Sequence, residues 1–173
     1  MNKAYYAPPS TDELEGELSL FPLDGLLPAG QAVSVNTECL IISLVSTNST
    51  SGNPILRQRL LTEPQMRLLL PLLQSPHYCP HQVLYASLSC SYGELLAGLF
   101  SSKCVAINEW LAIVQKASQL LEHAQAQGTW RKELKQLYNV LSELRPKLRP
   151  FSLGISISSA GSAYVLISLA TSE

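Results

Sequence analysis

The C-terminal part of the sequence decides the expected fold. Residues 129–169 read TWRKELKQLYNVLSELRPKLRPFSLGISISSAGSAYVLISL. At about 100° per residue, one side of a helix from Trp130 to about Arg145 collects the apolar residues. These are Leu134, Leu137, Tyr138, Leu141 and Leu144. The first half of the stretch therefore predicts an amphipathic helix, with Thr129 as its N-terminal cap.

The second half of the stretch has the period of a β-hairpin. Ile155 and Ile157 alternate with serines, the residues 160–162 supply a turn, and residues 163–169 supply a returning strand. The hairpin turn contains no Arg or Lys. The stretch as a whole predicts a helix followed by a hairpin with a polar tip.

The opposite face of the predicted helix is basic and rich in hydrogen-bonding groups. Arg131, Lys135, Asn139 and Ser142 gather there, with Lys132 and Gln136 beside them. Arginine pairs with guanine and asparagine or glutamine with adenine in the major groove. The flanking basic residues suited to phosphates are Lys132, Arg145, Lys147 and Arg149. The alternative to a DNA-binding role is that this polar face is exposed to solvent, as in any amphipathic helix, and binds nothing.

Upstream, the sequence predicts a small sheet and a helix. Residues 39–45 form an apolar, β-branched run, and residues 54–61 are a second strand candidate, so we expect a hairpin with one buried strand. Thr62 and Gln65 have the spacing of a capping box, which predicts a helix start. Pro71 inside that helix predicts a kink or an early stop.

Further helices are expected in the middle of the chain. Pro80 suits the first turn of a helix that includes Leu88. Residues 92–100 and a longer piece from about Asn108 to Gln127 have helical periodicity, and Gly128 supplies a stop. Trp110 and Trp130 fall on apolar helical positions and are interpreted as packing anchors.

In this order the elements resemble the DNA-binding domain of OmpR-type winged-helix regulators. In that family a leucine-arginine-x-lysine-leucine segment ends the recognition helix and a hairpin follows. Residues 144–148 (LRPKL) and 161–166 (GSAYVL) occupy those places here. The resemblance implies an α+β winged helix-turn-helix with an N-terminal β-hairpin and a C-terminal β-hairpin wing. Residues 91–127 would be a helical insertion, no receiver domain is visible, and Pro146 is expected to end the last helix early.

Composition sets the domain organisation. The 173 residues suit one domain. Residues 1–30 are rich in Pro, Gly and acids and predict an extended or partly disordered arm with a short strand at Leu18–Phe21, ahead of a single domain over 31–173. The charged fraction of 14% is low, which hints that a partner covers some surface.

Several functional classes are not expected. No Ser, Cys or Asp forms a recognisable nucleophile arrangement with a histidine, and the glycines are scattered, so we expect neither an enzyme nor a bound cofactor. Residues 77–81 (HYCPH) and Cys90 contain zinc-binding side chains, but a turn between helices fits their spacing better than a metal site. No apolar run is long enough for a membrane span and no signal peptide is evident, so we expect a cytoplasmic protein with free cysteines.

Two functions follow from these observations. The first is a transcription regulator that binds duplex DNA through residues 130–145, as a homodimer if the helix 108–127 serves as the dimerisation element. That helix is equally suited to packing on its own core. The second is a protein–protein interaction module or adaptor that uses the same frame without DNA.

Overall fold

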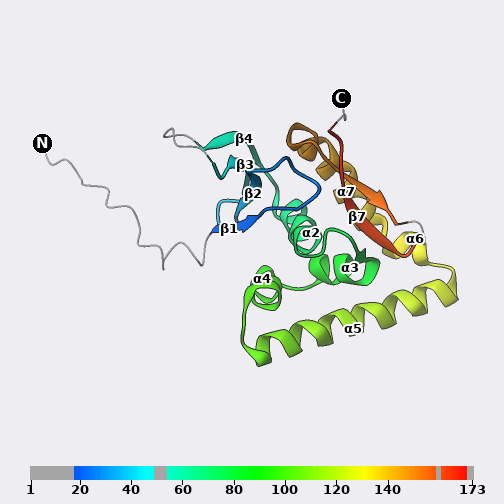
Figure 1. Cartoon of the computed structure of the whole chain (residues 1–173). Helices are drawn as coiled ribbons and strands as arrows, with labels where there is room; N and C mark the ends of the chain where they lie inside the picture. Colours follow the sequence, from blue (N-terminus) through cyan, green and yellow to red (C-terminus); the bar gives the residue numbers. More distant parts are fainter. Residues whose placement is uncertain (1–17, 49–53, 159–160, 171–173) are drawn as a thin grey trace, which may run out of the picture.

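The computed structural model describes residues 18–48, 54–158 and 161–170. The chain is an α+β protein, as the sequence predicts, with a four-stranded antiparallel sheet, a helical middle and a small C-terminal sheet (Figure 1). Helix α2 lies between the two sheets in this view. The arrangement places the last helix and the last hairpin together on one side of the molecule.

The N-terminal sheet has the order β1-β2-β3-β4. Its strands are β1 (Leu18–Phe21), β2 (Gln31–Asn36), β3 (Ile41–Ser46) and β4 (Ile55–Leu60). The predicted hairpin is β3 and β4, and the short strand predicted within the arm is β1, which pairs with β2. The sequence did not reveal β2. The sheet buries Val33, Val35, Ile42 and Leu44, and Leu23 from the segment expected as an arm joins this core.

Helix α2 (Glu63–Gln74) begins at the predicted capping box. The Thr62 hydroxyl accepts a hydrogen bond from the Gln65 backbone N–H, and the Gln65 side chain accepts one from the Thr62 N–H. The early stop at Pro71 is wrong, because α2 continues to Gln74. Burial of the leucines on both sides of Pro71 outweighs the one backbone hydrogen bond that proline cannot make.

The helical middle comprises α3 (His81–Ser89), α4 (Tyr92–Phe100) and α5 (Cys104–Gln127). The bounds predicted for α4 are confirmed, whereas α5 begins at Cys104 and not near Asn108. Gly128 ends α5 in the left-handed conformation that the stop signal predicted. Trp110 is a packing anchor, as expected, in a small core that joins α4 to α3 and α5.

The last predicted helix is divided in two. A single non-helical residue, Leu134, separates α6 (Trp130–Glu133) from α7 (Lys135–Leu148), and a short 3-10 helix η1 (Arg149–Phe151) follows. Thr129 occupies the N-cap position of α6, as predicted, but among the described residues its hydroxyl makes no capping hydrogen bond and donates instead to the Ala124 carbonyl at the end of α5. The early stop at Pro146 is wrong.

Burial explains how α7 continues past Pro146. Leu144 and Leu148 are both almost fully buried, one on each side of the proline. Tyr138, predicted in the core, is 37% exposed, and Val140 occupies the apolar face instead. The core face of the helix is therefore rotated slightly from the predicted one.

The C-terminal hairpin is confirmed. Strand β6 (Leu153–Ile157) pairs with β7 (Ala163–Ser168), and β7 also pairs with the two-residue strand β5 (Cys79–Pro80). The resulting three-stranded sheet has the order β5-β7-β6. Strand β5 ties this sheet to the segment just before α3.

Candidate nucleic-acid interface

The surface of α6 and α7 gathers exposed polar and basic side chains. The buried side of the pair consists of leucines and Val140. Buried residues recur every three or four positions along the pair, and most of the residues between them are exposed. The exposed predicted residues are Arg131, Lys132, Lys135, Gln136, Asn139, Ser142 and, just beyond α7, Arg149.

Most of these side chains are free to bind a ligand. In the described part of the chain, Arg131, Lys132, Lys135 and Asn139 make no side-chain hydrogen bond or ion pair. The Ser142 hydroxyl donates to the Tyr138 carbonyl at 2.9 Å and keeps its lone pairs for a donor. The face therefore offers cationic and amide groups that have no partner in the part of the chain that the structure describes.

Two of the predicted site residues do not lie on the exposed face of α6 and α7. Arg145 and Lys147 are only partly exposed. The Arg145 Nε donates to the Ile155 carbonyl at 3.3 Å, which connects α7 to β6. The Lys147 Nζ donates to the Gln65 side-chain oxygen at 2.6 Å and to the Leu60 carbonyl at 3.2 Å. Both cations connect α7 to other elements of the fold and are not part of the exposed face.

A tyrosine fixes the start of the exposed face against α3. The Tyr85 hydroxyl donates to a carboxylate oxygen of Glu133 at 3.2 Å. Burial of the phenol and the neighbouring Glu133 charge both raise the pKa of Tyr85, so the hydroxyl keeps its proton and remains a donor. Sequence analysis did not detect this contact, because its partners lie on different helices.

A histidine fixes the hairpin next to the start of α6. The buried His81 Nδ1 lies 3.1 Å from the Ser162 carbonyl, and since a carbonyl only accepts, Nδ1 is the protonated nitrogen. The His81 ring also makes edge contacts with Trp130 at 5.7 Å and Tyr164 at 4.9 Å. The hairpin turn and the first residue of α6 thus share one anchor.

Helix α5 ends beside this junction. Glu122 and Gln125 of α5 line a polar hollow of about 340 Å³ together with Trp130 and Ser162. A carboxylate consequently borders the place where the helix and the hairpin meet. The hairpin turn itself is neutral at Gly161 and Ser162, and residues 159 and 160 lie outside the described residues.

The other candidate sites have structural explanations. Cys79 pairs with Tyr164 in the sheet, and burial raises the pKa of its thiol to about 12. The described residues contain no group of three or more His, Cys, Asp or Glu side chains that suits a metal ion. All four cysteines are free.

Within the described residues, no single helix is long and apolar enough to cross a membrane. Helices α4 and α5 reach that length and composition only as a pair, which is bent by 119°.

Searches with the whole chain returned no match among protein-family models, curated proteins or solved structures.

Proposed function

We propose that this chain is a winged-helix protein that binds duplex DNA through α6 and α7 and acts as a transcription regulator. The observation that carries the proposal is the exposed face of this helix pair, where Arg131, Lys132, Lys135 and Asn139 have no hydrogen-bond or ion-pair partner among the described residues. An α-helix fits the major groove, and such side chains are the ones that read base edges and phosphates there.

The order of elements supports the same proposal. A sheet, α2, the short β5, α3, the last helix and a hairpin follow one another, and β5 completes a three-stranded sheet with that hairpin. This order is the one expected for the OmpR-type winged helix, with α4 and α5 as an insertion. In a winged helix, α6 and α7 are the recognition helix and the hairpin is the wing.

Individual roles follow from side-chain chemistry. Arg131 and Lys135 are placed to contact guanine or phosphate, and Asn139 to contact adenine, with Gln136 and Ser142 as further donors. Lys132 and Arg149 flank the face and suit phosphate oxygens. Arg145 and Lys147 position the helix and are not assigned to DNA.

A protein-interaction module is the competing function. It has in its favour the neutral hairpin turn and the carboxylates of Glu133 and Glu122 at the margins of the face. Carboxylates repel phosphate, so they weaken binding to DNA and suit a basic protein partner.

Binding to labelled duplexes of random sequence distinguishes the two functions. We expect the wild-type chain to bind them at low salt and Arg131→Ala with Lys135→Ala to bind at least about tenfold more weakly. Arg57→Ala with Arg59→Ala is the matched control, because it removes the same charge from the exposed strand β4 of the other sheet. Absence of binding by the wild type, or equal loss in both double variants, contradicts the DNA function.

A further inference from the structure

Helix α5 carries an exposed stripe in addition to its buried one. The buried stripe packs on α3 and α4 and contains Trp110 and Ala117. The exposed stripe covers about 80° of the helix and, at about 1.5 Å per residue, is about 22 Å long. Its members are Val105, Glu109, Ala112, Lys116 and Leu120.

The stripe has an apolar residue at each end that its own chain leaves uncovered. Val105 is 69% exposed and Leu120 is 48% exposed. Between them lie one acidic and one basic residue, Glu109 and Lys116, around the small Ala112. A small central residue allows another helix to approach closely.

The stripe is complementary to a second, antiparallel copy of itself, in both its apolar and its charged residues. If two copies of α5 are laid antiparallel about a two-fold axis between Ala112 and Ile113, Val105 lies opposite the partner's Leu120. In the same register Glu109 lies opposite the partner's Lys116. Because the axis repeats each contact, two apolar pairs and two ion pairs form at once.

Neither Glu109 nor Lys116 is neutralised by an ion pair among the residues that the structure describes. They are also about two helical turns apart, roughly 10 Å along the axis, which is too far for a contact with each other. Both charges are therefore available to a second molecule.

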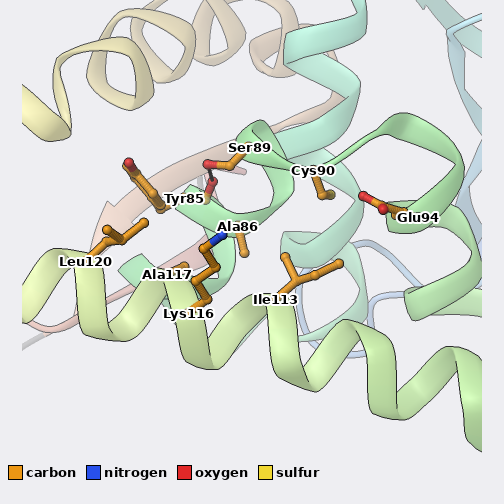
Figure 2. Close-up of a pocket in the computed structure, with 9 residues that line it drawn as sticks. All are labelled: Tyr85, Ala86, Ser89, Cys90, Glu94, Ile113, Lys116, Ala117 and Leu120. Carbon is orange, nitrogen blue, oxygen red and sulfur yellow. Dashed lines mark hydrogen bonds between the residues drawn. The ribbon is translucent and has the colours of Figure 1, made fainter.

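Two hollows lie beside the stripe, one toward each of its ends. The first is about 290 Å³, lies between α3 and α5, and is bordered by Lys116 and Leu120 (Figure 2). The second is about 270 Å³ and is bordered by Glu109 and Ala112. Ile113 lines both hollows, so an axis at this point places each hollow at the level of the partner's other hollow and leaves room there for the partner's side chains.

We propose that α5 pairs with α5 of a second copy of this chain, antiparallel and centred between Ala112 and Ile113, to form a homodimer. The pairing uses the stripe from Val105 to Leu120. It does not depend on DNA, so its test is made on the free protein.

Charge reversal tests the pairing by sedimentation equilibrium of the full chain. We expect a wild-type dimer that Glu109→Lys or Lys116→Glu weakens at least about tenfold, because each variant places like charges opposite one another twice. The double reversal restores both ion pairs and should return the dissociation constant to within a few-fold of wild type. Glu122→Lys is the control, since Glu122 is exposed on α5 outside the stripe.

The decisive outcome is rescue by the double variant. A wild-type monomer at tens of micromolar, or a double variant no better than the singles, overturns the proposal. Circular dichroism checks that each variant folds. If a single variant unfolds, Ala112→Cys combined with Cys104→Ser decides the matter: the proposal requires an intermolecular disulfide on oxidation through residue 112, and its absence overturns the pairing.

Discussion

The side-chain ammonium of Lys147 lies 2.6 Å from the side-chain oxygen of Gln65 and joins the end of α7 to the first turn of α2. The same Gln65 oxygen accepts the Thr62 backbone N–H of the capping box, and Lys147 also donates to the Leu60 carbonyl at the end of β4. One cation therefore connects the N-terminal sheet, the central helix and the last helix.

Removing this cation should destabilise the fold. Lys147→Ala deletes two charge-assisted hydrogen bonds from a partly buried site, so we expect a loss of about 1 to 3 kcal/mol in the free energy of unfolding. Lys135→Ala is the control, because that side chain is exposed and makes no hydrogen bond or ion pair with another described residue, and it should change stability by less than about 0.5 kcal/mol. Urea unfolding of both variants measures the difference, and equal stability contradicts the structural role of Lys147.

The structural role of Lys147 could not be predicted from the sequence. Lys147 and Arg145 have the same basic character as Lys135, and their spacing also allows an exposed position. What distinguishes them is contact with Gln65, Leu60 and Ile155 in other elements. Local periodicity contains no information about such contacts, because they depend on how the elements pack.

The elements with local signals were predictable. The capping box at Thr62, the left-handed Gly128 and the alternation in β6 each act within a few residues, and all three appear in the structure. Strand β2 and the buried continuation of α7 past Pro146 have no such signal. Pairing with β1 and β3 stabilises β2, and burial of Leu148 stabilises the end of α7.

A pair of glycines in α4 tests the packing of the inserted helices. A Cβ on Gly98 would lie 2.5 Å from the Cβ of Trp110, whereas a Cβ on Gly93 meets nothing within 4 Å. We expect Gly98→Ala to cost about 1 to 3 kcal/mol because α4 must move away from α5. Gly93→Ala should stabilise by up to about 1 kcal/mol, since alanine favours helix. Thermal unfolding of the two variants should therefore shift in opposite directions, and a stabilising Gly98→Ala is incompatible with this packing.

A single leucine tests the core beneath the exposed face. Leu144 is fully buried in the main core, so Leu144→Ala should cost about 2 to 5 kcal/mol through lost burial and the cavity left behind. Leu120→Ala removes the same atoms from an exposed site and should cost less than about 1 kcal/mol in the monomer's unfolding. Denaturant unfolding at low protein concentration compares them, and similar losses would refute the assigned burial.

The cysteines should differ in their reactivity toward a thiol reagent at pH 8. Cys39 and Cys104 are exposed and should react quickly, whereas Cys79 is buried with its thiol pKa raised from 9.0 to about 12 and should react only on unfolding. The folded state holds this proton more tightly than the unfolded state. Cys79 therefore contributes stability below about pH 9 that is lost as the pH rises toward 12. Rapid labelling of Cys79 in the folded protein contradicts its placement in β5.

The salt dependence of DNA binding tests the central claim most directly. The logarithm of the binding constant should fall linearly with the logarithm of the salt concentration, and Arg131→Ala with Lys135→Ala should make that slope shallower by about 2. Arg57→Ala with Arg59→Ala, on β4, should leave the slope at its wild-type value. A slope that is the same in all three proteins would show that α6 and α7 do not contact DNA.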